Sequence, residues 1–273
     1  MKQKVSDYIA DRLAQEGISQ VFTVTGGGAM HLNDSLGHHP GLSCLYHHHE
    51  QAAAMAAEAY ARVDNRMAAV CVTSGPGATN AITGALCAWM DSIPMLVLSG
   101  QVRYDTTVRH SGLKIRTMGV QEYDITPSVE PMTKYAVMVT DPLTIRYHLE
   151  RAIYLAKTGR PGPCWLDLPL NVQSAVVETD DLKAYDPSED AKELPAPVSE
   201  EMVKQILEKL KLASQPLIFA GHGIRLAGAY DEFQHLVELL GIPVVTGMSS
   251  IDLMESAHPL YVGRNGGTGN RPG

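Results

Sequence analysis

The feature of this sequence that most constrains its fold is a repeated order of short apolar run, glycine-rich turn and helix-forming segment. Runs at 21–24, 68–73 and 216–220 are predicted strands, and a glycine-rich turn follows each of them at once. Strands that pass directly into such turns and helices form parallel sheets with helices on both faces. We therefore expect an α/β protein, a parallel sheet flanked by helices, followed by a partial second α/β domain.

Composition divides the chain into two parts. Between residues 178 and 195, Asp, Glu, Lys and Pro dominate and apolar periodicity is lost, as is typical of a linker. We predict a first domain at 1–177, a linker at 178–195 and a second domain at 196–273. That second domain is expected to be truncated, because after two predicted strands the chain runs into an open glycine-rich segment at 263–273.

Charge and cysteine usage exclude some classes of partner. The formal net charge is −8, with 22 basic and 30 acidic residues, which argues against nucleic acid and anionic membranes as partners. No apolar run approaches the length needed to span a bilayer, and the first residues lack a signal-peptide pattern. The four cysteines are scattered, without paired or metal-ligand spacing, so we expect reduced thiols in a cytoplasmic protein.

A carboxylate stands where a predicted strand passes into a predicted helix. Glu50 follows the strand 42–46 and opens an alanine-rich helix, and the helix dipole favours a carboxylate in the first turn. In open parallel sheets, ligands bind at such junctions. The residues alone leave two interpretations open, a Glu that caps its own helix and a carboxylate that works in a site. Glu58, two turns further on, is expected to face solvent.

The same helix carries apolar residues at helical spacing, which predicts one face that packs closely against a neighbour. These residues are Ala52, Met55, Ala56, Ala59, Tyr60 and Val63.

Other patterns are weaker on their own. Each glycine-rich turn fits either an anion cradle or an ordinary turn, and none matches a dinucleotide or P-loop fingerprint. Consecutive residues of an extended chain point to opposite faces, so His47–His49 are poorly placed to chelate, and we predict no metal ligands in this chain. His49 is expected to line a site. Ser74 lacks the flanking pattern of a hydrolase nucleophile.

Together these segments resemble the N-terminal, pyrimidine-binding domain of thiamine-diphosphate enzymes. Within that family, the similarity is greatest to the acetolactate synthase (acetohydroxyacid synthase) group, and it continues after the predicted linker as the start of the family's central domain. The segments that carry the resemblance are Phe22–Gly28, His49–Arg62, Val72–Asn80, Asp91–Pro94, Thr158–Pro163, Asp167–Pro169, Asn171–Gln173, Ala220–Gly223 and Gly241–Val244.

The resemblance implies a catalytic role for Glu50. In this family the matching Glu hydrogen-bonds the aminopyrimidine ring of thiamine diphosphate and promotes its imino tautomer, whose nitrogen removes the proton from the thiazolium carbon. A buried carboxylate beside a ring nitrogen suits that task. By the same resemblance, Gly26, Gly27, Pro76 and Asn80 line the pyrimidine pocket.

Two departures from the family pattern affect substrate and cofactor. Gln121 matches a Gln near the reacting carbon in the synthases, but Val120 replaces the usual aromatic residue before it, which leaves pyruvate-type selection in doubt. The Gly-Asp-Gly motif that holds the diphosphate through Mg²⁺ does not occur in these 273 residues. The chain is therefore expected to supply half of an active site, within a homodimer or tetramer or beside a complementing subunit that carries the diphosphate-binding domain.

The resemblance thus predicts a transferase that condenses 2-oxo acids and forms a carbon–carbon bond, as in branched-chain amino acid biosynthesis. FAD is a further cofactor that the central domain of the synthases often holds. Two alternatives stay open, a 2-oxo acid decarboxylase on the same scaffold and a non-catalytic fragment or pseudo-subunit.

Overall fold

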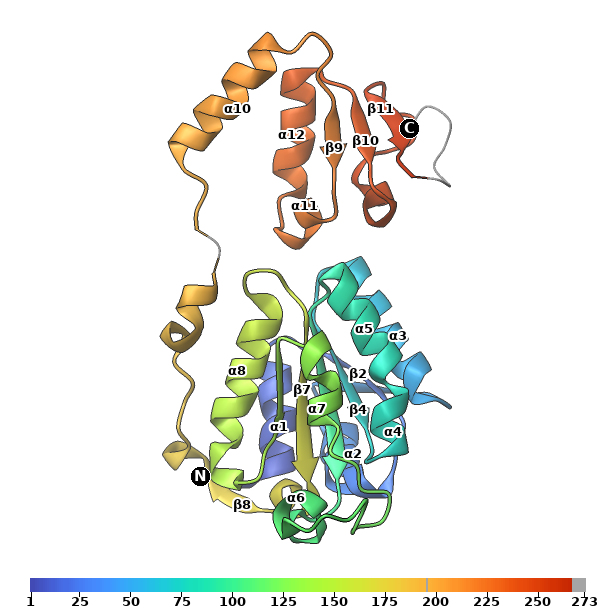
Figure 1. Ribbon diagram of the computed structural model, residues 1–273, viewed down its shortest axis with the longest axis vertical. Coiled ribbons are helices and arrows are strands. Elements are labelled where there is room, and N and C mark those ends of the chain that lie inside the picture. Colours follow the sequence, from blue (N-terminus) through green and yellow to red (C-terminus); the bar gives the residue numbers. More distant parts are fainter. Residues whose placement is uncertain (195, 267–273) are drawn as a thin grey trace. The chain divides into compact units, whose positions relative to one another are not determined.

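A computed structural model of the chain divides into two compact units, Met1–Leu194 and Pro195–Gly273 (Figure 1). The structure describes residues 1–194 and 196–266. Each unit is described by itself. Within these described ranges, no helix is both long enough and apolar enough to cross a membrane.

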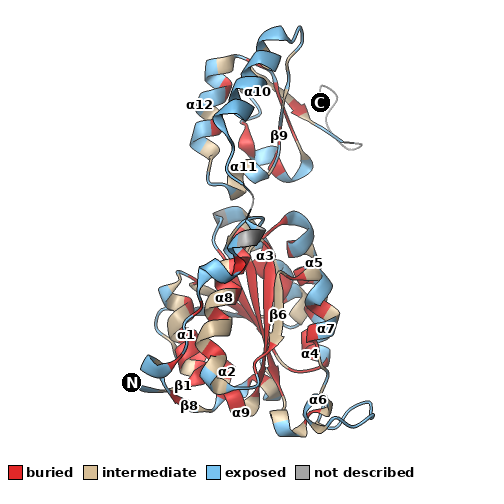
Figure 2. Ribbon diagram, turned by 60° about the vertical axis from the view of Figure 1, so that its left-hand side comes forward, coloured by how far each residue is buried: buried red, intermediate tan, exposed pale blue. Residues whose placement is uncertain are grey.

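The first unit is built on a six-stranded sheet in which every neighbouring pair of strands is parallel, in the order β3-β2-β4-β5-β7-β6. The prediction of a parallel α/β sheet is confirmed. Figure 2 shows the central strands to be almost wholly buried, as expected when helices cover both faces. The strands are β2 (Gln20–Thr23), β3 (Ser43–Tyr46), β4 (Ala68–Val72), β5 (Met95–Gln101), β6 (Tyr135–Met138) and β7 (Pro163–Pro169).

Helices cover the sheet in two sets. Helices α1 (Val5–Gln15), α2 (Met30–His38) and α8 (Ile145–Lys157) share one buried apolar cluster with the strands. Helices α3 (Glu50–Asp64) and α5 (Ile82–Asp91) pack against each other on the opposite side (Figure 1). The shorter helices are α4 (Pro76–Asn80), α6 (Val108–Ser111), α7 (Thr126–Val129) and α9 (Leu170–Gln173).

The face that α3 buries differs from the predicted one. Its buried side is lined by small residues such as Ala53, Ala54 and Ala57, and α5 approaches so closely that a Cβ on Gly84 would lie 2.4 Å from the Cβ of Ala54. On the predicted face, Met55 and Val63 are exposed. Within the chain the neighbour therefore packs on the other face, because alanine occupies both sides of the helix. Packing of the predicted face against a second chain stays a prediction.

Glu58 was also predicted wrongly, because it is buried rather than solvent-facing. Its carboxylate pairs with Arg62 one turn along α3, and the Arg62 guanidinium also contacts Asp91 at the end of α5, at 2.5 Å. A buried carboxylate needs such a partner. Glu58 therefore ties α3 to α5.

The segment predicted as a linker is mostly part of the first unit. Strand β8 (Val176–Glu178) pairs antiparallel with β1 (Lys2–Lys4). Further along, Asp190 accepts two hydrogen bonds from Arg151 of α8, at 2.8 and 2.9 Å, and a third from Tyr185 at 2.6 Å. These contacts explain why the structure places the boundary after Leu194 and not at residue 177.

The second unit has a smaller parallel sheet in the order β11-β10-β9, one strand more than the sequence predicted. Its core includes Phe233, Val237 and Val244. Of the predicted glycine-rich segment 263–273, the first two residues belong to β11, and residues 267–273 lie outside the described residues. The elements are β9 (Ile218–Ala220), β10 (Val244–Thr246), β11 (Tyr261–Arg264), α10 (Glu200–Leu212), α11 (Gly223–Leu226) and α12 (Tyr230–Leu240).

Candidate functional site

Strand order places the candidate site at the carboxyl ends of the strands in the first sheet. From β2 the chain goes to β3 on one side, and from β4 it continues to β5 and β7 on the other, so the order reverses between β2 and β4. Ligands of open α/β sheets bind beyond the carboxyl ends of the strands at such a reversal. The turns that follow these two strands are Gly26–Gly28 and Ser74–Gly77, and Glu50 follows the neighbouring strand β3.

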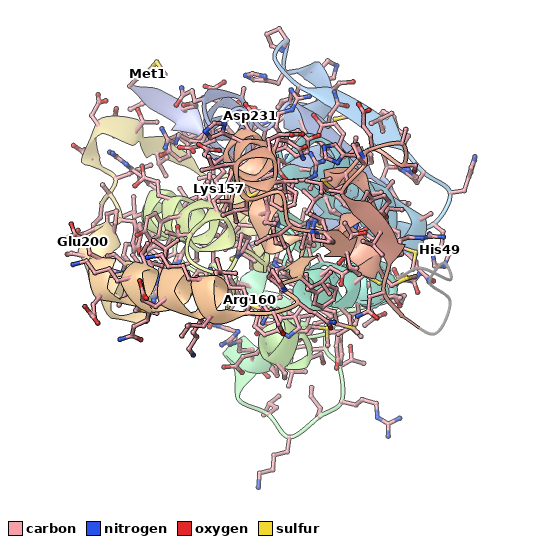
Figure 3. All side chains as sticks on the ribbon, turned by 90° about the horizontal axis from the view of Figure 1, so that it is seen from above. Met1, His49, Lys157, Arg160, Glu200 and Asp231 are labelled. Carbon is pink, nitrogen blue, oxygen red and sulfur yellow. The ribbon has the colours of Figure 1, made fainter. Side chains whose placement is uncertain are left out.

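Glu50 is the first residue of α3, but it does not cap that helix. The cap is His49, whose Nδ1 accepts a hydrogen bond from the Gln51 N–H at 3.1 Å. Oε2 of Glu50 accepts a hydrogen bond from Nδ2 of Asn80 at 2.9 Å, so this side chain reaches across to α4. His49, labelled in Figure 3, is exposed. Its side chain caps the start of α3 and does not line the site.

The Glu50 carboxylate is half-buried, whereas the sequence predicted a buried one. The reason lies in its position at the first turn of α3, at the edge of the sheet rather than between sheet and helix. A Cβ on Gly77 would lie 3.3 Å from Oε1 of Glu50. The carboxylate is therefore held through one oxygen by Asn80, while its other oxygen lies beside the turn after β4.

The turn after β4 is shaped by Gly75, whose φ of +53° is costly for residues with a side chain. A Cβ on Gly75 would lie 2.0 Å from the carbonyl oxygen of Gln121, so the backbone of a distant loop is packed directly on this turn. Pro76 then occupies the first position of α4, where its fixed φ suits a helix start.

The turn after β2 is held from three sides. The N–H of Gly26 donates to Oδ1 of Asn33 at 3.2 Å, and the N–H of Gly28 donates to Oγ1 of Thr73 at 3.0 Å. The carbonyl of Gly28 accepts from Nε2 of Gln173 at 2.7 Å. Gly27 differs from its neighbours, because a Cβ there would meet none of the described residues within 4 Å. Gly27 therefore borders open space, which suits a residue that faces a ligand.

The structure thus brings together most of the residues predicted from the sequence. Asn80 contacts Glu50 directly, Pro76 lies in the turn beside them, and the main chain of Gln121 lies against that turn. The side chain of Gln121 is exposed, and its φ is +57°. Their roles toward a cofactor stay predictions.

No sequence pattern predicted the residues that hold these turns, chiefly Asn33, Thr73 and Gln173. Thr73 and Gln173 stand inside segments that carried the family resemblance, but a single sequence gives no signal of what they hydrogen-bond. Gln173 lies 145 positions from its partner Gly28.

A buried carboxylate lies near the carboxyl end of β7, at the same end of the sheet. Asp167 of β7 accepts hydrogen bonds from the Ser99 hydroxyl at 2.6 Å and from the Gln101 amide at 3.1 Å. Gln101 also donates to the carbonyl of Tyr123 at 2.8 Å, which connects β5 to the loop that carries Gln121. Burial raises the pKa of Asp167 to about 7, although the hydrogen bonds from Ser99 and Gln101 favour the ionised form.

This shifted pKa predicts a pH dependence of stability. Since the ordinary value is 3.8, the folded state binds more protons than the unfolded state between about pH 4 and 7. The contribution of Asp167 to the free energy of unfolding therefore decreases as pH rises through that window and is constant above it. Asp167→Asn should remove this slope in urea unfolding measured from pH 4 to 8, and the exposed Asp181→Asn should keep it. Equal slopes in wild type and Asp167→Asn would contradict the assignment.

Metal ligation is not evident at this edge. Among the residues that the structure describes, no group of three or more His, Cys, Asp and Glu side chains could hold a metal ion.

Comparison with known families identifies this architecture. Residues 3–122 match the family described as thiamine pyrophosphate enzyme, N-terminal TPP binding domain, and residues 203–273 match the central domain of thiamine pyrophosphate enzymes. The chain belongs to the thiamine pyrophosphate enzymes. The family resemblance predicted from the sequence is confirmed, and Gly26, Glu50, Asn80 and Gln121 all lie within the N-terminal match.

Similar proteins of this family include several acetolactate synthase large subunits. The chain is 35% identical to the acetolactate synthase large subunit of Lactococcus lactis over 266 residues, which are 96% of this chain and 44% of that relative. It is 32% identical to the isozyme 3 large subunit of Escherichia coli over 268 residues, 96% of this chain and 44% of the relative. The chain therefore spans less than half the length of these relatives.

Proposed function

We propose that this chain supplies the pyrimidine-activating half of a thiamine-diphosphate site that condenses 2-oxo acids, as in an acetolactate synthase. The observation that carries the proposal is the placement of the Glu50 carboxylate. It follows the edge strand β3 and reaches toward the turn after β4, where Asn80 holds one of its oxygens at 2.9 Å, and it does not cap its own helix. Nearly full-length similarity of the chain to acetolactate synthase large subunits supports the reaction type.

The residues at this edge fit an aminopyrimidine ring. Gly27 borders open space, because a Cβ there would meet none of the described residues within 4 Å. At Gly26 and Gly77 the position of a Cβ is taken by Thr73, at 2.4 and 2.6 Å, and a Cβ on Gly77 would also lie 3.3 Å from Oε1 of Glu50. In the proposal, a flat ring approaches the backbone at Gly27, with a ring nitrogen toward the carboxylate. In the proposal, Glu50 exchanges a proton with that nitrogen, Asn80 fixes the orientation of the carboxylate, and Pro76 bounds the ring.

When bound, thiamine diphosphate supplies the nucleophilic carbon and the electron sink of the reaction. We place its diphosphate and Mg²⁺ on residues outside this sequence, because Gly-Asp-Gly does not occur in the 273 residues. FAD is proposed as a further cofactor, bound by the second unit, with the match to the central domain as its support. Gln121 is proposed to contact the 2-oxo acid substrate, since its backbone is packed on Gly75 at the same edge.

The proposed assembly is a homodimer or tetramer, or a complex with a complementing subunit that holds the diphosphate. Its support is the exposed apolar face of α3 and α5, where Val63 is 76% and Met90 66% exposed. Sedimentation of the purified chain at micromolar concentration tests it, and a single monomeric species would count against self-association.

The proposed compartment is the cytoplasm, supported by four free cysteines. The reaction would serve branched-chain amino acid biosynthesis.

Product analysis tests the reaction class. The assembled enzyme is incubated with pyruvate, thiamine diphosphate and Mg²⁺, and the products are identified by NMR. We expect acetolactate. Free acetaldehyde would instead identify a decarboxylase on the same scaffold, and the absence of both products together with absent C2 proton exchange of the cofactor would identify a non-catalytic module.

A further inference from the structure

The loop between β5 and α7 carries Gln121 but has little packing of its own. It joins no strand of the sheet in the described structure, and its helices are limited to one turn at Tyr104–Thr106 and α6. Most side chains between Leu113 and Met118 are exposed. A segment of this kind needs specific polar contacts to keep one conformation, since few buried apolar contacts oppose its opening.

Gln101 and Asn171 hold the two ends of the loop through Tyr123 and Tyr104. Within the loop, three contacts come from one side chain, Glu122. Its Oε1 accepts a hydrogen bond from the N–H of Val108 at 2.6 Å, at the start of α6. Its Oε2 accepts from the N–H groups of Met118 at 2.9 Å and Gly119 at 3.3 Å. Hydrogen bonds from N–H groups to an ionised carboxylate are stronger than neutral ones. One carboxylate thus joins residues that lie 14 positions before it to those three or four before it.

Glu122 directly follows the residue that contacts the site. Gln121 has a φ of +57°, in the left-handed region that is uncommon for residues other than glycine. Its carbonyl oxygen lies only 2.0 Å from the position that a Cβ on Gly75 would occupy. A left-handed backbone is maintained only when the surrounding structure fixes it. The Gly75 turn lies on one side of Gln121, and on the other side the Glu122 carboxylate acts together with the hydrogen bond from Gln101 to the Tyr123 carbonyl.

We infer that Glu122 is a positioning residue of the site: by binding three backbone N–H groups of its own loop, its carboxylate holds Gln121 against Gly75. This inference rests on the proposed function only in taking Gln121 as a residue of the site. It assigns Glu122 no contact with substrate or cofactor, and its effect on the reaction passes through the backbone of Gln121.

The test compares Glu122→Gln with wild type in the full 273-residue chain. An amide has one oxygen, so Gln keeps the acceptor for one side of the loop and turns its NH₂ group toward the N–H donors of the other. Trypsin cleavage after Lys114 and Arg116, followed by mass spectrometry, should become about tenfold faster because the loop opens more often. The matched control is Glu130→Gln, an exposed carboxylate after α7, which should leave the cleavage rate unchanged.

A second readout separates positioning from loop folding alone. With ¹⁵N-glycine labelling, the amide signal of Gly75 should shift or broaden in Glu122→Gln, although Gly75 lies in another segment of the chain. Unchanged cleavage would overturn the inference. Faster cleavage with an unchanged Gly75 signal would overturn it too, because Glu122 would then act on its own loop only.

If Glu122→Gln does not fold, the unmodified chain still provides a test. The amide hydrogens of Val108 and Met118 should exchange more slowly than those of the exposed residues 113–116, and equal rates would overturn the inference. None of these measurements needs bound cofactor or turnover. A chain that forms no acetolactate can therefore still support the role of Glu122, and an active enzyme can refute it.

Discussion

Glu50→Gln is expected to reduce cofactor activation in the assembled enzyme by about two to four orders of magnitude, the range that general acid–base groups contribute. The amide keeps the size and shape of the side chain, and its oxygen still accepts the hydrogen bond from Asn80. It cannot exchange a proton with a ring nitrogen. The free energy of unfolding should change by at most about 1 kcal/mol, because only the interaction of the carboxylate with the helix start is lost.

The measurement is C2 proton exchange of thiamine diphosphate, followed by NMR in deuterated buffer. Glu58 is unsuitable as the control, since it is buried and paired with Arg62. Glu130→Gln replaces it, because Glu130 is exposed and lies outside the site. Near-normal exchange in Glu50→Gln, with normal exchange in Glu130→Gln, would show that the carboxylate has no acid–base role, and the central assignment would fail.

The fold could be predicted because its signals are local, whereas the grouping of the site residues was predicted from the family resemblance. A strand followed at once by a glycine-rich turn identifies a parallel sheet, and Glu50, Gly26 and Pro76 each stand directly beyond the end of a strand. In a parallel sheet such positions meet at one edge. The family resemblance predicted that Gly26 and Pro76 share a pocket with Glu50, and the parallel sheet explains why these positions lie near one another.

The errors arose where the structure depends on partners distant in sequence. Residues 178–194 have the composition of a linker, but Arg151 binds Asp190 across 39 positions and holds the segment on α8. Glu58 stands on a helix that carries alanine on both sides, and its partner Arg62 is held in turn by Asp91, which lies 29 positions further along. Asp167 is buried with Ser99 and Gln101 of another strand. The pairings across 29 or more positions leave no pattern in a single sequence.

The packing of the Gly26–Gly28 turn leads to the second large expected effect, which is on stability. Gly100 lies buried in β5, and a Cβ there would lie 2.1 Å from the carbonyl oxygen of Gly28 and 2.4 Å from its carbonyl carbon. Both atoms belong to the backbone, so no flexible side chain can move aside. The turn is also fixed by Gln173 and Thr73. Gly100→Ala must therefore displace either the strand or the turn.

We expect Gly100→Ala to lower the free energy of unfolding by about 1–3 kcal/mol, as overpacked cores do, and to shift the Gly26 and Gly28 amide signals in NMR spectra. Urea unfolding measures the first effect. Gly27→Ala is the matched control, because a Cβ there meets none of the described residues within 4 Å, and its stability should stay within about 0.5 kcal/mol of wild type. If Gly100→Ala were as stable as Gly27→Ala, β5 would not hold the turn, and Gly28 would depend on Gln173 and Thr73 alone for its position at the site.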